Sequence, residues 1–205
     1  MKIFVTGGAG FIGISLCKKL SSSHKVTVYD NFSNSNQDNF PIIENVTLIV
    51  GDILDNPKLI NSMKNHDVVI HLAAKTNVID SINNPADTLQ TNVQGTQNVI
   101  DSCKFNKISK IIVTSSAAIY QNSDSPIDET NPIEPLSPYG QSKLDMEKIT
   151  IQSKINYTVL RLFNVYGDGQ NTGVIANFGK NILENKPLII FGDGKAIRDF
   201  IHIDD

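Results

Sequence analysis

Residues 2–13 read Lys-Ile-Phe-Val-Thr-Gly-Gly-Ala-Gly-Phe-Ile-Gly and are the most informative part of the chain about its fold. Its first half is a short β-branched run, which predicts a buried strand that the glycines end at once. Gly7 allows a tight turn, Gly10 lets a backbone approach a pyrophosphate, and Gly13 lets the following helix pack closely on the strand. That helix, predicted over 11–21, presents free N–H groups to an anion. The stretch therefore predicts a strand, a phosphate-binding loop and a helix in succession.

The rest of the chain repeats this alternation of strand and helix. Further strands are predicted at 25–29, 46–50, 67–72, 110–115 and 157–163, and helices at 56–65, 86–105 and 138–153. The strand runs lack polar alternation, so both faces of the sheet should be covered, as in parallel sheets between helix layers. The pattern predicts an α/β protein with a doubly wound parallel sheet of the Rossmann type.

Beyond about residue 165 the pattern changes, because glycines separate short segments. A helix is predicted over 174–185 and a short strand over 188–191. We expect residues 1–170 to form a dinucleotide-binding domain, and residues 171–205 to belong to part of a second domain.

Composition and charge exclude several classes of protein. Among 205 residues, 18 Lys and Arg stand against 21 Asp and Glu, so there is no basic surplus for binding nucleic acid. No apolar run approaches the roughly 20 residues that span a bilayer. Met1-Lys2 leads into a strand rather than a signal peptide, and Cys17 and Cys103 are too few for a disulfide framework. We expect a cytoplasmic protein without a membrane anchor or a structural metal.

The second predicted strand is followed by Asp30. In a fold of this type, a carboxylate at that place accepts hydrogen bonds from the ribose hydroxyls of NAD and repels the 2′-phosphate of NADP. An aspartate that merely faces solvent after a glycine turn is the alternative interpretation. The combination of strand, glycine loop, helix and Asp30 favours NAD as the cofactor.

The glycine spacing resembles that of the extended short-chain dehydrogenase/reductase family, in its NAD-dependent epimerase/dehydratase branch. Similar family segments are His71-Leu72-Ala73-Ala74, Asn92-Val93-Gln94-Gly95-Thr96 and Arg161-Leu162-Phe163-Asn164-Val165-Tyr166-Gly167. The resemblance implies that NAD is bound by Gly7, Gly10, Phe11, Ile12, Gly13, Asp30, Asn31, Asn34, Ser35, Asp52, Ile53, Leu72, Ala73, Ala74, Asn92 and Phe163, together with Tyr139 and Lys143. His71 itself is interpreted as a packed core histidine without a catalytic role.

Tyr139 and Lys143 stand four residues apart at the start of a predicted helix, which places them on one face. A tyrosine with a pKa of about 10 is a poor base at neutral pH, so it needs a nearby cation. The resemblance implies that Ser116, or alternatively Ser115, hydrogen-bonds the reacting sugar hydroxyl while Tyr139 takes its proton. A chance surface pair is the alternative interpretation of the Tyr-x-x-x-Lys spacing taken alone.

The residues after Ser116 separate branches of the family. Nucleotide-sugar dehydratases carry Asp-Glu where this chain has Ala117-Ala118, and alanine cannot perform acid–base chemistry. The segment 114–120 is instead similar to the UDP-glucose 4-epimerase-like branch. The resemblance implies an isomerase that passes through a transient 4-keto sugar and returns the hydride to the other face, without net redox change. Which hexose is bound stays open.

On the substrate side, Asn164 and Arg198 match family residues that contact the diphosphate of a UDP-sugar. A local salt bridge between Arg198 and Asp199 is the alternative interpretation. The resemblance also implies a homodimer through the paired helices 86–105 and 138–153, and a larger sugar-nucleotide domain than this chain provides.

Two other functions remain open. A net oxidoreductase or decarboxylase of the same family, such as a keto-sugar reductase, would consume added NAD(P)H stoichiometrically. A truncated, non-catalytic NAD-binding protein would bind NAD tightly without turning over UDP-sugars. The presence of Ser116, Tyr139 and Lys143 together favours an enzyme.

Overall fold

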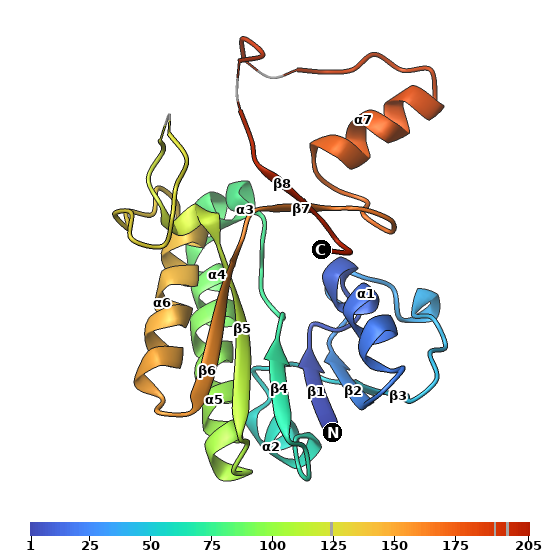
Figure 1. Cartoon of the computed structure of the whole chain (residues 1–205), viewed down its shortest axis with the longest axis vertical. Coiled ribbons are helices and arrows are strands. Elements are labelled where there is room, and N and C mark those ends of the chain that lie inside the picture. The colour runs from blue at the N-terminus through green and yellow to red at the C-terminus, as the bar shows by residue number, and fades with distance from the viewer. Residues whose placement is uncertain (124, 191, 196) are drawn as a thin grey trace. The chain divides into compact units, whose positions relative to one another are not determined.

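The computed structural model describes residues 1–123, 125–190, 192–195 and 197–205. The chain divides into two compact units, Met1–Arg161 and Leu162–Asp205, and each is described by itself (Figure 1). No helix within the described residues is long and apolar enough to cross a membrane.

A six-stranded sheet forms the centre of the first unit. Its strands are β1 (Lys2–Thr6), β2 (Lys25–Asp30), β3 (Val46–Val50), β4 (Val68–His71), β5 (Lys110–Ser116) and β6 (Asn156–Leu162). Their order is β3-β2-β1-β4-β5-β6, and the pairs β3–β2, β2–β1, β1–β4 and β4–β5 are parallel. The chain crosses from β3 to the far side of β1, which makes β1/β4 the switch point of a doubly wound sheet. The predicted fold class is confirmed.

Helices cover both faces of this sheet (Figure 1). They are α1 (Phe11–Leu20), α2 (Asn56–Ser62), α3 (Val78–Asn83), α4 (Pro85–Leu89), α5 (Gly95–Phe105) and α6 (Pro138–Gln152). One buried core joins Phe4 and Ile111 of the sheet to α2, α5 and α6, and the other joins Val5 and Val28 to Cys17 of α1. Burial on both faces explains why the strand sequences show no polar alternation.

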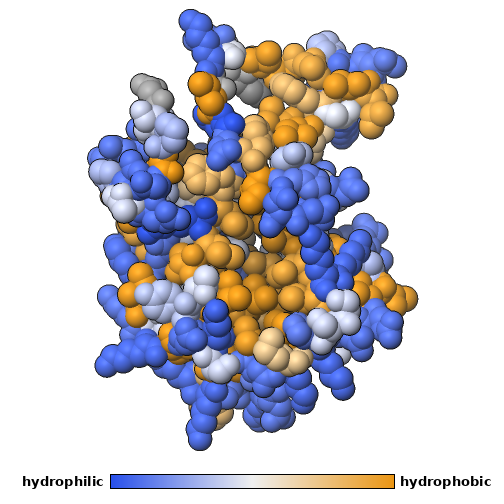
Figure 2. Space-filling view, in the orientation of Figure 1, coloured by the Kyte–Doolittle hydropathy of each residue, from blue (hydrophilic) through white to orange (hydrophobic). Residues whose placement is uncertain are grey.

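The face that α1 covers in part is strongly apolar. Figure 2 shows apolar side chains gathered over the middle of the sheet in this view. Leu72, Ile112 and Val68 are partly buried there against the core beneath α1. Both cysteines are buried and free, and burial raises the pKa of each thiol to about 12, so Cys17 and Cys103 act as small core residues.

The predicted helix over 86–105 is not a single regular helix. It consists of α4, a π-helical turn (Gln90–Gln94) and α5. The short helix α3, which precedes it, was not predicted. Asn77 caps α3 by accepting hydrogen bonds from the N–H groups of Ile79 and Asp80. Six residues are too few for a helical period to appear in the sequence.

The second unit contains β7 (Asn164–Tyr166), α7 (Val174–Leu183) and β8 (Phe200–His202). The two strands pair in parallel, and the Tyr166 ring packs edge-on against Phe200 and His202. The strand predicted over 188–191 is wrong for residues 188–190, which form no strand, and Phe191 lies outside the described residues. The apolar run alone did not suffice, because a strand also needs a partner for its backbone groups.

Candidate active site

The parallel strands of the first unit bring the candidate residues to one edge of the sheet. Gly7 follows β1, Asp30 ends β2, Leu72 follows β4, and Ser116 ends β5. All four positions lie at carboxyl ends of strands. Doubly wound sheets bind their ligands at this edge, beside the switch point.

The glycine loop between β1 and α1 leaves room only for backbone. Gly7 has a φ of +70°, and a Cβ atom there would lie 2.5 Å from the Ala73 nitrogen. A Cβ atom on Gly13 would lie 2.5 Å from the Gly7 carbonyl oxygen. Gly10 precedes α1 without a side-chain cap, and the first turn of that helix holds no acidic residue. The N–H groups of the first turn of α1 are therefore available to an anion, which fits a dinucleotide pyrophosphate.

Asp30 lies beside this loop and is half-buried. One carboxylate oxygen accepts the Ala9 N–H at 3.0 Å, and the other accepts the Phe32 N–H at 2.8 Å. These bonds fix the orientation of the carboxylate, and each oxygen keeps a lone pair for another donor. An anion with free acceptor capacity fits a pair of ribose hydroxyls and disfavours a phosphate at the same place.

The turns after β2 and β3 are tied together by Asn31 and Asp52. The Asn31 Nδ2 atom donates to Asp52 Oδ2 at 2.9 Å. In the turn that follows Asn31, Asn34 is exposed and Ser35 is half-buried. Ile53 differs, because its side chain belongs to the core packed against α5. Ile53 therefore supports these turns from beneath rather than from their surface.

The segment after β4 is held close to the glycine loop. The Leu72 N–H donates to the Thr6 carbonyl at 3.0 Å. Asn92, in the π-helical turn, accepts the Lys75 N–H at 2.7 Å and donates to the Lys75 carbonyl at 3.0 Å and to Ser142 Oγ at 2.9 Å. The Asn92 side chain is fully buried, so it acts on the site through the loop that it holds. The other predicted contacts near the loop are half-buried: Phe11, Ile12, Leu72, Ala73 and Ala74.

Ser116 and Tyr139 meet at this edge. The Ser116 hydroxyl oxygen accepts the Ala118 N–H at 3.1 Å, at the start of a 3-10 turn, Ala117–Ile119. Tyr139 is 9% exposed, and its phenol hydrogen-bonds with the Ser116 side chain. Burial raises the pKa of Tyr139, and the Ser116 hydrogen bond acts in the opposite direction. Among the described residues, the buried Ser115 hydroxyl has no hydrogen-bond partner, so the geometry favours Ser116 over Ser115.

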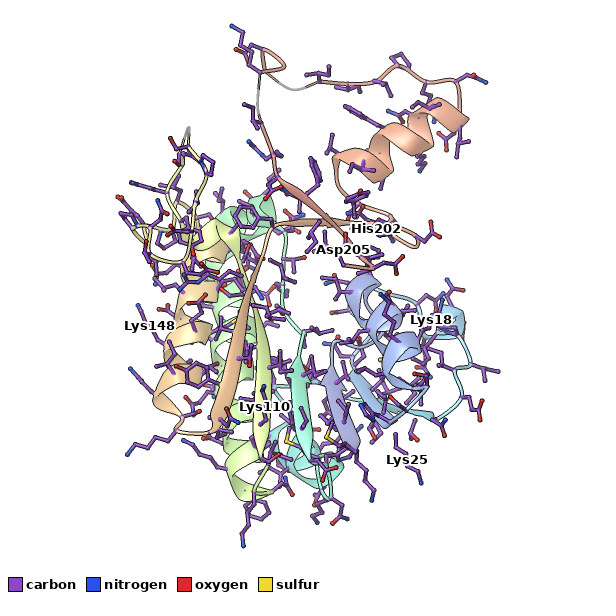
Figure 3. All side chains as sticks on the ribbon, in the orientation of Figure 1. Lys18, Lys25, Lys110, Lys148, His202 and Asp205 are labelled. Atoms are coloured by element: carbon purple, nitrogen blue, oxygen red, sulfur yellow. The ribbon has the colours of Figure 1, made fainter. Side chains whose placement is uncertain are left out.

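Lys143 lies one turn further along α6, with Nζ 6.0 Å from the centre of the Tyr139 ring. Its Nζ donates to the Thr114 carbonyl at 3.0 Å, and burial lowers the pKa of Lys143 to about 8. The ammonium form still predominates at neutral pH, and a buried cation near the phenol favours the phenolate. Lys148 on the same helix points outward and pairs with Asp145 at 3.2 Å (Figure 3). One helix thus holds a site cation and a surface cation.

A second polar cluster supports this edge from β6. The Arg161 Nε and Nη2 atoms donate to the two carboxylate oxygens of Glu147 at 3.0 and 2.9 Å. Its Nη1 donates to the Tyr120 hydroxyl at 2.6 Å, and the guanidinium carbon lies 5.2 Å from the centre of the Tyr120 ring. The cluster joins α6, β6 and the turn after Ser116. It therefore fixes Ser116 relative to Tyr139.

Sequence reasoning missed Glu147 and Ser81, which both position the site. Glu147 could have been recognised, because it extends the spacing of Tyr139 and Lys143 by four more residues along one helix face. Ser81 of α3 is fully buried, and its hydroxyl accepts the Tyr139 N–H at 3.1 Å. No pattern in the sequence points to Ser81, because its contact joins helices that lie far apart along the chain.

Three predicted residues lie in the second unit. Phe163 stands just before β7, and Asn164 Nδ2 donates to the Asp199 carbonyl at 2.7 Å, which fastens β7 to the segment before β8. Arg198 is exposed, and its Nη1 donates to the adjacent Ile197 carbonyl at 2.7 Å. Within the described part of this unit, Arg198 forms no ion pair with Asp199, so its guanidinium is available to another anion.

Comparison with known proteins places this site in a family. The sequence model of the NAD dependent epimerase/dehydratase family matches residues 3–205. A Methanocaldococcus jannaschii protein assigned as a UDP-glucose 4-epimerase is 41% identical over 215 residues, which cover 99% of this chain and 70% of that protein. The UDP-glucose 4-epimerase of Corynebacterium glutamicum is 32% identical over 100% of this chain and 68% of its own length.

Solved structures agree with the sequence matches. UDP-glucuronic acid 4-epimerase from Bacillus cereus, in complex with UDP-glucuronic acid and NAD, superposes with a TM-score of 0.91 at 35% identity. The superposition covers 100% of this chain and 70% of that one. The family match over residues 3–205, together with this superposition, makes this chain a member of the NAD dependent epimerase/dehydratase family.

Proposed function

We propose that this chain is an NAD-dependent nucleotide-sugar 4-epimerase that acts on UDP-sugars. The observation that carries the proposal is the hydrogen bond between Ser116 and Tyr139, with Lys143 facing the Tyr139 ring. A hydroxyl, a phenol and a buried cation are the groups needed to move a proton to and from a sugar hydroxyl. The 4-epimerase names of the relatives described above support the same function.

NAD is the proposed cofactor, and the glycine loop and Asp30 fit its pyrophosphate and ribose. Further proposed contacts are Phe11, Ile12, Asn31, Asn34, Ser35, Asp52, Ile53, Leu72, Ala73, Ala74, Asn92, Tyr139, Lys143 and Phe163, of which Ile53 and Asn92 act by holding loops. Bound NAD supplies the reversible two-electron oxidation of a carbinol carbon.

Tyr139 is the proposed base for the hydroxyl at C4 of the sugar. The Ser116 oxygen already accepts the Ala118 N–H, so the Ser116 proton is free to point toward the phenol or toward a sugar oxygen. Lys143 stabilises the phenolate before it takes the sugar proton. The configuration at C4 changes during the reaction, so the C4 oxygen can lie on either face of the sugar ring. The Tyr139 phenol must therefore return the proton to this oxygen in both configurations. Tyr139 therefore serves both half-reactions.

Ala117 and Ala118 argue against a 4,6-dehydratase. Removal of water needs an acid for the departing hydroxyl and a base for the neighbouring proton, and methyl groups supply neither. A net oxidoreductase or decarboxylase of the same family is the second candidate. It is favoured by 31% identity to the UDP-N-acetyl-alpha-D-glucosaminuronate decarboxylase of Bacillus cytotoxicus.

The second unit supplies the proposed substrate contacts. The exposed Arg198 guanidinium would bind the diphosphate through its forked donors, and Asn164 would contact the same group. We assign residues 1–170 to the cofactor domain and 171–205 to the start of a nucleotide-sugar domain.

Product analysis with a panel of UDP-sugars tests the proposal. The purified chain is incubated with NAD and UDP-glucose, UDP-N-acetylglucosamine or UDP-glucuronic acid. The expected result is a C4 epimer of at least one sugar without accumulation of NADH. Release of CO2 or stoichiometric consumption of NAD(P)H would instead identify the second candidate, and NAD binding without any product would contradict both enzymes.

A homodimer and a cytoplasmic location complete the proposal. Ile79 and Ile82 of α3 and Leu89 of α4 are exposed apolar side chains on helices that pack beside α6. A second copy would cover them, together with α5 and α6. Light scattering should give the mass of two chains for the wild type and of one chain for Ile82→Glu. Cell fractionation tests the location.

A further inference from the structure

A row of buried polar groups crosses the first unit from β1 to α6. All of its members are fully buried: Thr6, His71, Thr96, Asn92 and Ser142. Thr6 Oγ1 lies 2.7 Å from His71 Nδ1, and His71 Nε2 lies 3.0 Å from Thr96 Oγ1. Thr96 Oγ1 donates to the Asn92 carbonyl at 2.5 Å, and Asn92 Nδ2 donates to Ser142 Oγ at 2.9 Å. The row thus links the strand before the glycine loop to the helix that presents Tyr139.

The carbonyl of Asn92 fixes the directions of the hydrogen bonds between Thr96, His71 and Thr6. A carbonyl can only accept, so the Thr96 hydroxyl gives its proton to Asn92 and must accept one from His71. His71 therefore carries its proton on Nε2, and its bare Nδ1 accepts the Thr6 hydroxyl. The Thr6 oxygen in turn lies 3.4 Å from the Ala73 N–H. A single arrangement satisfies every group.

At the α6 end of the row, a carbonyl again fixes the direction of the hydrogen bond. The Ser142 hydroxyl donates to the Tyr139 carbonyl at 2.7 Å, so it accepts from Asn92. Protonation of His71 would remove the Nδ1 acceptor to which the Thr6 hydroxyl donates. Burial, with the Lys143 charge adding to it, lowers the pKa of His71 to about 3, which keeps the imidazole neutral.

We propose that His71, held as its Nε2–H tautomer, is a positioning residue that fixes the first turn of α6, and with it Tyr139, relative to the cofactor loop. The role for Tyr139 rests on the proposed function, but the tautomer and the linkage do not. His71 itself touches no reacting atom. It acts through Thr96, Asn92 and Ser142.

Thr150 offers a matched control for Thr96. Both threonines are fully buried, and both donate to the carbonyl four residues earlier, Thr150 to Met146 at 2.8 Å. Thr96 alone also accepts from His71. Thr96→Val and Thr150→Val therefore remove the same intrahelical bond, whereas only Thr96→Val breaks the row.

Nitrogen NMR of histidine-labelled protein reads the tautomer directly. His66 serves as an internal reference, because its Nδ1 lies 3.1 Å from the Met63 carbonyl and must carry the proton. The expected spectrum shows opposite tautomers for His71 and His66 in the wild type and in Thr150→Val. In Thr96→Val, His71 should lose its single tautomer. A wild-type His71 protonated on Nδ1 would overturn the proposal.

The linkage to Tyr139 is tested by its ring resonance and by turnover. Thr96→Val should shift the Tyr139 resonance and lower kcat by up to about 100-fold, because small misplacements of a catalytic group are costly, with KM unchanged. Thr150→Val should do neither. Ser142→Ala, which cuts the row at its other end, should shift Tyr139 while leaving the His71 tautomer intact, and it decides the matter if Thr96→Val does not fold.

Equal losses of kcat in Thr96→Val and Thr150→Val, with the same Tyr139 ring resonance in both variants, would refute the linkage. If no UDP-sugar is turned over by the wild type, the proposed function fails. The His71 and Tyr139 spectra then still decide this inference.

Discussion

Arg161 in the first unit and Arg198 in the second have opposite surroundings. The Arg161 side chain is 21% exposed and donates to both oxygens of Glu147 and to Tyr120. Arg198 is exposed and donates to the carbonyl of its neighbour Ile197. Groups that must transfer a proton need partners at fixed distances, and the first unit provides them. The second unit instead leaves a cation free to bind a ligand.

The apolar residues show the same contrast. The first unit encloses two buried cores, whereas Val174, Ile175, Ile182 and Leu183 of α7 are exposed. Substitutions in the first unit should therefore change stability or turnover, and substitutions in the second should change affinity for the substrate.

Tyr139→Phe should have the largest effect on turnover. Loss of the base should lower kcat about 10²–10⁴-fold. Binding of NAD, measured by calorimetry, should stay near the wild-type value because the ring remains. Tyr157→Phe, at a half-exposed tyrosine of β6, is the control and should keep full activity. Wild-type turnover in Tyr139→Phe would remove Tyr139 from the mechanism.

Arg161→Leu and Arg198→Leu test the contrast between the two arginines. Arg161→Leu leaves the Glu147 carboxylate, which is 4% exposed, without its cation, and should lower the free energy of unfolding by about 3–5 kcal/mol. Arg198→Leu should change it by less than about 0.5 kcal/mol and should weaken UDP-sugar binding. Urea denaturation and calorimetry measure the two effects. Equal destabilisation by both variants would contradict the contrast.

Gly7→Ala and Gly169→Ala form a second matched pair, because both glycines have positive φ. A Cβ atom on Gly169 meets nothing within 4 Å, so only backbone strain of about 1–2 kcal/mol is expected. A Cβ atom on Gly7 also collides with the Ala73 backbone, so the loss of stability should be larger and NAD binding should fall. Similar NAD affinities for the two variants would argue against the glycine loop as the cofactor site.

Among the variants expected to change the free energy of unfolding, Lys143→Met should have the smallest effect on it, and that effect depends on pH. The folded chain holds the pKa of Lys143 at about 8, well below its usual value, so the unfolded chain binds the extra proton above pH 8. Stability of the wild type therefore rises with pH in this window, whereas Lys143→Met lacks that contribution. Relative to the wild type, the free energy of unfolding of Lys143→Met should therefore fall by about 1 kcal/mol between pH 7 and 9.

Urea denaturation of both proteins across this pH range measures how the difference in their free energies of unfolding changes. Contributions from cysteines and tyrosines cancel in the difference between the two proteins. Lys195→Met, at an exposed lysine of the second unit, should show no such trend. If the difference in the free energy of unfolding between the wild type and Lys143→Met did not change with pH, the Lys143 amine would not be desolvated in the folded chain.

The strands could be predicted because β-branched runs buried on both faces leave a plain signal, as in β1 and β5. The π-helical turn around Asn92 could not, because its extra residue leaves the 3.6-residue period almost unchanged. β8 also escaped prediction. Its pairing with β7 joins residues far apart along the chain, such as Asn164 and Phe200.

Parts of the candidate site were predictable for chemical reasons. The Gly7 turn, Asp30 and the Tyr139–Lys143 spacing are local patterns, and local patterns are visible in one sequence. Ser81 and Arg161 act through long-range partners, which no local pattern encodes. Ile53 and Asn92 were predicted at the cofactor site, but their side chains are buried beneath it.

We propose that the chain oxidises and re-reduces the sugar at C4 using Tyr139 and a cofactor that undergoes no net change. The decisive experiment incubates the wild-type chain and NAD with a UDP-sugar labelled with deuterium at C4. The expected product is a C4 epimer that keeps its deuterium at C4, with no accumulated NADH, and Tyr139→Phe should form no product. Loss of the label to solvent, or failure of every UDP-sugar in the panel to form a C4 epimer, would refute this mechanism.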